Sequence, residues 1–150
     1  MISIGEGKII SILNKARVNF IPEKTFHDLK HGLYRFDFYI PNYNGNQIVI
    51  EYNGAQHYSQ IKKFHKTRTD FIAAQERDRR KISYCLANDI KIYCIPYWEE
   101  PNLKTIDDLL QDKFLARTRW KNDEDWQNNP DGFAEEYTQE TWETLRTINA

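Results

Sequence analysis

Two acidic residues in neighbouring β-type runs have the chemistry of a metal site. Asp37 alternates with Phe36 and Phe38, and Glu51 belongs to the similar run 47–52. Alternation with a period of two is typical of β-strands, so we expect Asp37 on the face away from the two phenylalanines. Mg²⁺ is usually bound by one or two carboxylates together with water and substrate phosphate oxygens. If the two acids face each other, the pair forms a candidate site for Mg²⁺, with Mn²⁺ as the alternative ion.

The loop between the two runs decides whether the acids face each other. Asn44-Gly45 is typical of a tight hairpin turn. A two-residue loop there puts Asp37 and Glu51 on opposite faces, whereas a three-residue loop over 43–45 puts them directly opposite each other. Like charges in the second arrangement repel, so a cation would stabilise it. The alternative is two solvated acids on the exposed face of the hairpin.

Basic side chains flank the acidic pair along the chain, with Arg35 before it and the others after it. A run of charge is usually only a solvated face, but next to candidate metal ligands it suits the backbone of a nucleic acid. The candidates for phosphate contact are Arg35, Lys62, Lys63, Lys66, Arg68, Arg77, Arg79 and Arg80.

The N-terminal segment is expected to form an amphipathic helix over 4–17. Ser3 and Glu6 have the spacing of a capping box. The inward stripe contains Ile9, Leu13 and Ala16. Glu6 falls on this stripe, so it either caps Ser3 or points at the hairpin and joins the acidic site, and the sequence leaves both readings open. A short strand is expected over 17–21.

A long helix is expected over 69–88. Its buried face contains Phe71, Ile82, Cys85 and Leu86. Asp78 lies within this stripe, with Arg79 and Lys81 at its flanks. A buried carboxylate is costly unless it is paired or liganded, so Asp78 either makes a structural salt bridge or serves the site.

The remaining elements are expected around this helix. The run 89–96 has apolar residues on both faces, which is typical of a central strand, and the intervening helix favours a parallel pairing with one hairpin strand. An amphipathic helix is expected over 102–117. His27 and His31 are expected on the surface.

Composition favours one folded domain with an unusual tail. The chain has 150 residues, of which 40% are hydrophobic and 14% aromatic. Residues 1–119 contain 19 Lys and Arg against 14 Asp and Glu, whereas 120–150 contain 2 against 8. A basic body favours a polyanionic partner. We therefore predict a core over 1–117 and an acidic, aromatic helical extension over 118–150 that packs on the body or on a second subunit.

Compartment follows from what the sequence lacks. No apolar run is long enough to cross a bilayer, and no secretory leader is evident, so we expect a cytoplasmic protein that does not enter membranes. Cys85 and Cys94 lie in apolar segments without zinc-type spacing and are expected to be buried free thiols.

Four short motifs occur in a characteristic order over about residues 3–98. They are Gly5-Glu6, Arg35-Phe36-Asp37, Ile50-Glu51-Tyr52-Asn53-Gly54-x-Gln56-His57 and Arg77-Asp78-x-x-Lys81. Together they resemble the PD-(D/E)xK nuclease superfamily, and more closely its branch of very-short-patch-repair and phage homing-type endonucleases. The resemblance implies a restriction-endonuclease-like α/β fold, with a mixed β-sheet flanked by helices, and metal-dependent cleavage of DNA phosphodiesters.

The resemblance also implies roles for individual residues. Asp37 would be the central metal ligand and Glu51 the second carboxylate. His57 would be the general acid or base, or would position the nucleophile; the alternative is a structural histidine. Glu6 would be a helical acid near the site, and Asp78 would orient or charge His57.

One departure from the superfamily affects the expected chemistry. The catalytic lysine expected two residues after Glu51 is Asn53, where the nearer branch often has Asp. Gln56, His57 or Lys81 would have to replace that lysine, or the protein is inactive. The resemblance therefore implies a Mg²⁺-dependent DNA endonuclease of phage or mobile-element origin, and it leaves open whether the enzyme nicks one strand and whether it is a homodimer. The alternatives are an inactive nucleic-acid-binding module and a protein-interaction factor that works through the tail.

Overall fold

The computed structural model describes residues 3–54 and 68–116. Within them, four strands form one mixed sheet in the order β1-β2-β3-β4. The strands are β1 Ile21–Thr25, β2 Arg35–Tyr43, β3 Asn46–Asn53 and β4 Ile90–Pro96. The first three are antiparallel, and β3 pairs with β4 in parallel, as predicted for the run 89–96. The predicted extension over 118–150 lies outside the described residues.

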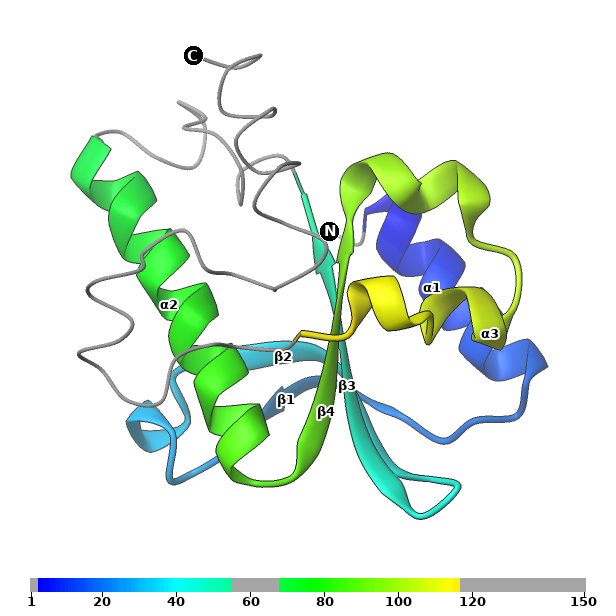
Figure 1. Ribbon diagram of the computed structural model, residues 1–150, viewed down its shortest axis with the longest axis horizontal. Coiled ribbons are helices and arrows are strands. Elements are labelled where there is room, and N and C mark those ends of the chain that lie inside the picture. Colours follow the sequence, from blue (N-terminus) through cyan, green and yellow to red (C-terminus); the bar gives the residue numbers. More distant parts are fainter. Residues whose placement is uncertain (1–2, 55–67, 117–150) are drawn as a thin grey trace.

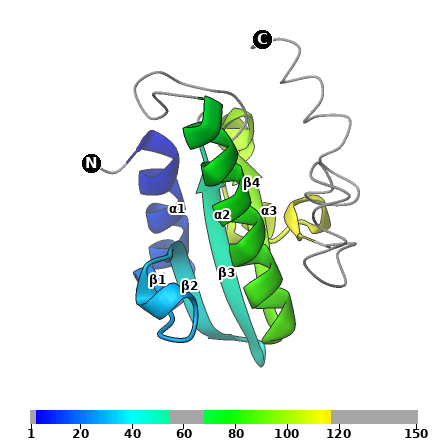
Figure 2. The same cartoon turned by 90° about the vertical axis from the view of Figure 1, so that its left-hand side faces the viewer.

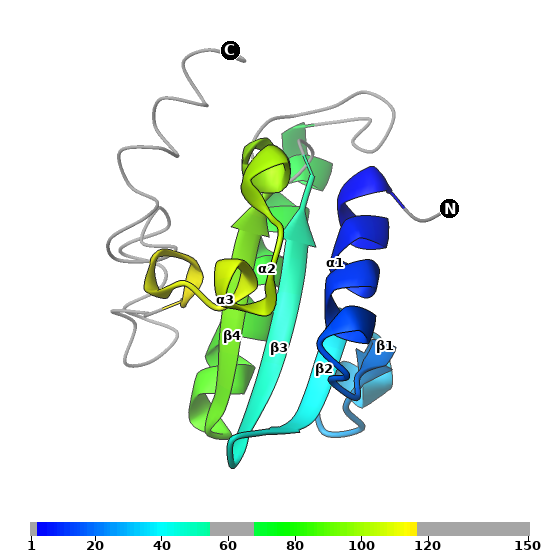
Figure 3. The same cartoon turned by 90° about the vertical axis from the view of Figure 1, so that its right-hand side faces the viewer.

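Helices cover both faces of the sheet, so the chain belongs to the α/β class (Figure 1). Helix α2, Arg68–Ala87, lies on one face, while α1, Ile4–Lys15, and α3, Ile106–Leu109, lie on the other (Figures 2 and 3). Each face has its own apolar cluster. The α1 side contains Ile9, Leu13, Phe38, Ile50, Ile95 and Phe114, and the α2 side contains Phe36, Val49, Ile82, Cys85 and Ile92.

The β2–β3 hairpin has a two-residue turn and a β-bulge beside it. Asn44 and Gly45 both have positive φ, 52° and 86°, as a tight hairpin turn requires. Tyr43 pairs with Asn46 across this turn, and the register then shifts between Ile40 and Tyr43. The bulge adds one residue to β2, so every pair beyond it is displaced by one position.

This bulge puts the two acids opposite each other. The pairing ends at Phe38 and Ile50, and the same register extended by one residue places Asp37 opposite Glu51. The turn is therefore the two-residue form, yet the acids meet as expected for the three-residue form. Expecting Phe36 and Phe38 on one face was wrong, because they pack in different clusters. The last β2–β3 pair is Phe38–Ile50, so β3 no longer constrains Phe36.

Helix α1 confirms the first predicted helix with one change in its buried face. Ile9 and Leu13 are buried as expected, but Ile12 joins them and Ala16 is exposed. The reason is that the helix ends at Lys15, so Ala16 is its C-cap and no longer follows the helical stripe. The strand expected over 17–21 was also misplaced, because β1 begins only at Ile21 and pairs with β2 from Ile21 to Thr25.

The continuous helix expected over 102–117 was wrong. A 3₁₀ helix at Tyr97–Asn102 precedes the segment, which itself contains only the one-turn α3 and a second 3₁₀ helix at Asp112–Phe114. Beyond them the chain lies along the free edge of β4: the Ala116 N–H donates to the Ile92 carbonyl at 2.9 Å, and Leu115 bridges Tyr93. Pairing with the sheet edge therefore overrides the helical pattern of the sequence.

Candidate functional site

Asp37 and Glu51 lie where β2 and β3 separate. The Tyr52 N–H donates to Asp37 Oδ2 at 2.9 Å, and the Asp37 N–H points to Glu51 Oε2 at 3.4 Å. Each carboxylate thus takes a backbone N–H of the other strand, at the point where ladder hydrogen bonds end. This exchange fixes both side chains between the strand ends, and the predicted juxtaposition of the two acids is confirmed.

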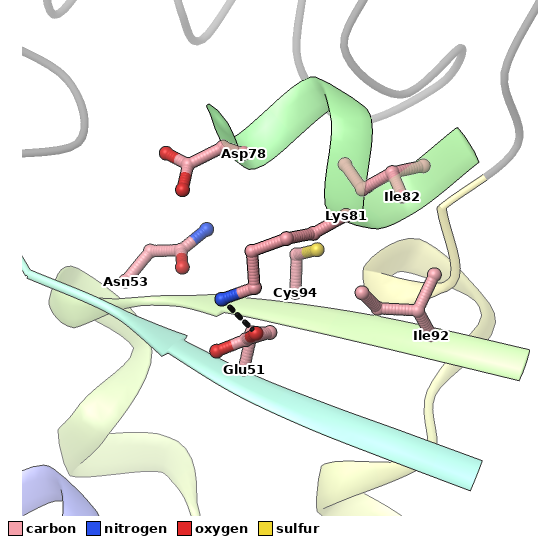
Figure 4. A pocket seen from close by; sticks show the side chains of 7 residues that line it. All are labelled: Glu51, Asn53, Asp78, Lys81, Ile82, Ile92 and Cys94. Atoms are coloured by element: carbon pink, nitrogen blue, oxygen red, sulfur yellow. Dashed lines mark ion pairs between the residues drawn. The ribbon is translucent and has the colours of Figure 1, made fainter. Parts of the chain in front are cut away.

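Helix α2 places a cation on this acidic pair. Lys81 Nζ lies 2.5 Å from Glu51 Oε1 (Figure 4). Both side chains are largely buried, at 12% and 7% exposed. The aliphatic part of Lys81 is held by packing of the same helix, because Ile82 and Cys85 belong to the core, and its ammonium also lies 4.9 Å from the centre of the Phe36 ring.

Electrostatics at the pair favour a further cation. Burial and the neighbouring Glu51 raise the pKa of Asp37 from 3.8 to about 8, although Lys81 and the Tyr52 N–H act in the opposite direction. Asp37 is therefore largely protonated at neutral pH when Lys81 is the only nearby cation. A divalent ion between the two carboxylates would favour the ionised form of both.

The acids that destabilise the charged form of Asp37 stabilise the charged form of Lys81. Burial alone would lower its pKa, but Glu51, Asp78 and Asp37 together raise it above its ordinary value. Lys81 is therefore a permanent positive charge at neutral pH, and it cannot serve as a base in this arrangement.

A small pocket opens beside this ion pair. It is lined by Glu51, Asn53, Asp78, Lys81, Ile82, Ile92 and Cys94 (Figure 4). Asn53 is 4% exposed. The sequence analysis noted Asn53 only as a departure from the lysine pattern and missed its burial in the site. The available signal was its position two residues after Glu51, which puts both side chains on the same face of the strand. Asp78 is half-buried within the helical stripe, as predicted.

The donor set fits Mg²⁺ better than a softer ion. In the described part of the chain, no three His, Cys, Asp or Glu side chains converge on one point. Two carboxylates suffice for Mg²⁺, which keeps several waters and takes other oxygens from its substrate. Cys85 and Cys94 are both buried free thiols, as predicted, and burial raises the pKa of each.

Glu6 caps the first turn of α1 together with Ser3, which is one of its two expected roles. Its N–H donates to Ser3 Oγ at 3.1 Å, and its carboxylate accepts from the Ser3 hydroxyl. It lies on the α1 side of the sheet next to Tyr52, whereas Glu51 faces α2. The structure therefore does not bring Glu6 into the acidic pair.

The basic candidates divide by exposure. Arg35, Arg77 and Arg80 are exposed, but Arg79 is 4% exposed, so expecting it on a phosphate-binding surface was wrong. The physical reason is its position three residues before Ile82, which turns it toward the sheet. Gln56, His57, Lys62, Lys63 and Lys66 lie outside the described residues, and Arg68 begins α2 with a side chain that is not described.

Comparison with known proteins finds a distant relative of viral origin. The Uncharacterized protein 307L of Invertebrate iridescent virus 6 is 36% identical over 86 residues, which are 56% of this chain and 42% of that protein. The match thus covers less than half of the relative's length. No known family and no solved structure matches the chain. Among the described residues, no helix is both long and apolar enough to cross a bilayer.

Proposed function

We propose that the protein is a Mg²⁺-dependent DNA endonuclease of the PD-(D/E)xK type. The observation that carries this proposal is the meeting of Asp37, Glu51 and Lys81 from three separate elements in one partly buried site. The site lies toward the carboxyl ends of the parallel pair β3 and β4, where ligands bind in open α/β sheets.

Asp37 and Glu51 would hold the ion. Bound Mg²⁺ would supply Lewis acidity toward the scissile phosphate and lower the pKa of a water molecule. The chain's own contribution is positional, because the Tyr52 N–H orients Asp37 and the Lys81 ammonium orients Glu51. Lys81 also supplies the positive charge that Asn53 cannot, and this charge would stabilise the additional negative charge of the transition state.

The proton transfers are assigned to His57. An imidazole with an ordinary pKa of about 6.5 exchanges protons near neutral pH, which typically contributes about 10²–10⁴ in rate. Gln56 beside it would orient the attacking water. We further propose a viral or mobile-element enzyme that acts in the host cytoplasm, as a monomer or homodimer. The viral relative agrees with that origin.

A second candidate is a nucleic-acid-binding protein that has lost catalysis. The observation in its favour is that Lys81 already neutralises Glu51, while an amide stands at Asn53. If the ammonium cannot be displaced from Glu51, Mg²⁺ has only Asp37 as a ligand. Binding of DNA without cleavage would then be the whole function.

Cleavage of supercoiled plasmid in Mg²⁺, Mn²⁺ or EDTA tests the first proposal. We expect nicked or linear product with either metal and none with EDTA. Asp37→Asn and Glu51→Gln should each lower the rate at least about 10³-fold, because each removes a ligand for the ion. Asp89→Asn is the matched control: it removes an exposed acid at a positive φ of 56° that Asn tolerates, and it should cleave normally.

The same experiment separates the two candidates. Cleavage by the wild type that persists in Asp37→Asn would reject the assigned site. Tight DNA binding by the wild type, with no cleavage in either metal, would select the inactive binding protein.

A further inference from the structure

The segment between β1 and β2 forms a compact loop over residues 26–34. Its ends are joined because Thr25 pairs with Arg35, and a Cβ atom added at Gly32 would lie 3.9 Å from the Thr25 side chain. Compact surface loops with paired ends are frequently functional. Figures 1 and 2 show this loop beside α2.

Three successive residues of this loop are left-handed. Lys30, His31 and Gly32 have φ of 49°, 53° and 79°. Only the glycine adopts this conformation without cost, so the loop stores strain at two residues with long side chains. Such strain persists only where the surrounding structure determines the backbone.

The inner side of the loop supplies that support. The Tyr84 hydroxyl donates to Asp28 Oδ1 at 2.6 Å, and the Phe26 ring lies 5.2 Å from the Tyr84 ring and 5.5 Å from the Phe36 ring. Leu29 also packs against the α2-side cluster. The loop is therefore anchored to α2 one helical turn beyond Lys81.

The outer side of the loop carries exposed basic side chains. Lys30 is exposed, and so is Arg35 at the start of β2. Neither Lys30 nor Arg35 forms an ion pair with any residue in the described ranges. Asp28 is the only acidic residue of the loop, and its carboxylate accepts a hydrogen bond from the Tyr84 hydroxyl.

We propose that the outer side of the 26–34 loop, together with Arg35, binds the phosphate backbone beside the cleaved bond. This inference rests on the proposed nuclease function. Arg35 precedes Asp37 by two residues, which is roughly 7 Å along a strand. A phosphate next to one held at Asp37 and Glu51 would therefore lie within reach of Arg35, and the exposed Lys30 belongs to the loop that ends at Arg35.

Salt-dependent binding to a labelled random-sequence DNA duplex tests this contact. Fluorescence anisotropy is measured with the full chain in EDTA, so that no cleavage occurs. The double variant Lys30→Gln/Arg35→Gln should reduce the slope of log K against log salt by about 1 for each lost contact. The matched control is Lys15→Gln/Lys91→Gln, which removes two exposed cations far from the acids and should leave the slope almost unchanged.

A second variant separates contact from folding. Lys30→Gly should raise Tm by about 2–4 °C because it relieves a left-handed residue, and it should still weaken DNA binding several-fold. A merely structural loop would not become more stable and bind less tightly at once. Equal slopes for the two double variants, or unchanged affinity of Lys30→Gly, would overturn the inference while leaving the nuclease proposal intact. Absence of DNA binding by the wild type would overturn both.

Discussion

At the residue scale, the central feature is a buried acid whose charge is not fully compensated. Asp37 faces Glu51, and Lys81 pairs with Glu51 rather than with Asp37. The result is a carboxyl group with a pKa of about 8, which is protonated in the folded protein over a range where the unfolded chain has already lost the proton. Ionisation of this carboxyl group lowers the stability of the folded protein. The ionised group is also a ligand for a divalent cation.

This asymmetry predicts how stability depends on pH. Between the ordinary value of 3.8 and about 8, the folded state holds one more proton than the unfolded state, so the free energy of unfolding falls as pH rises. Asp37→Asn removes this effect while retaining an oxygen acceptor for the Tyr52 N–H. In EDTA at pH 8, we expect the variant to be more stable than the wild type, on the order of a few kcal/mol, with the difference disappearing near pH 4. Urea denaturation at several pH values measures it.

Metal addition supplies the control for that experiment. Mg²⁺ should stabilise the wild type at pH 8 and have little effect on Asp37→Asn, because a neutral amide replaces one ligand. Equal stabilisation of both proteins would mean that the ion binds elsewhere.

At the scale of elements, the site depends on how α1 and the hairpin meet the sheet. Gly5 in the first turn of α1 lies directly against Tyr52, which follows Glu51 on β3. Tyr52 also points to the Tyr97 carbonyl at 3.4 Å, so one side chain connects α1, β3 and the segment after β4. Close approach of the helix therefore fixes the strand end that carries the acid.

Gly5→Ala tests this close approach. A Cβ atom at Gly5 would overlap the Tyr52 ring, so the ring or the helix would have to move. We expect a loss of about 1–3 kcal/mol in the free energy of unfolding, although Ala is normally the better helix residue by about 1 kcal/mol. Combination with Tyr52→Leu should recover part of the loss. A stabilised single variant would contradict the packing.

At the scale of the whole molecule, the candidate site joins parts of the chain that are far apart in sequence. β2 contributes Asp37, β3 contributes Glu51, and α2 contributes Lys81 from the opposite wall of the pocket. The parallel pairing of β3 with β4 requires a connection that crosses one face of the sheet, and α2 lies on that face. The ion pair between Lys81 and Glu51 is thus a tertiary contact between two layers.

A double-mutant cycle measures this contact. Lys81→Met leaves the Glu51 carboxylate buried beside Asp37, so we expect a loss of about 3–5 kcal/mol at pH 8. Glu51→Gln leaves the ammonium without its partner and should also destabilise. The double variant should lose clearly less than the sum of the two, as measured by urea denaturation. Additive losses would show that the two side chains do not interact in solution.

The sequence by itself determined the elements whose local pattern agrees with their final environment. The hairpin turn follows from Asn44-Gly45, whose left-handed conformations suit those residues, and α2 follows from a stripe that the core does bury. The pairing of Asp37 with Glu51 depended on register, which the turn left undecided between two forms. A β-bulge between Ile40 and Tyr43 settled it, and the local signal was Pro41, which cannot donate a ladder hydrogen bond and lies at that bulge.

Only the tertiary structure decided the rest. The helix expected over 102–117 does not form, because the end of this segment pairs with the edge of β4. Local helix propensity does not account for such pairing with a distant strand. Lys81 was one of several replacements for the missing lysine, and only the packing of α2 on the sheet placed its ammonium on Glu51. The burial of Arg79 and the anchored loop at 26–34 have the same origin: a side chain's surroundings are set by elements distant in sequence, whereas a sequence pattern records only its neighbours along the chain.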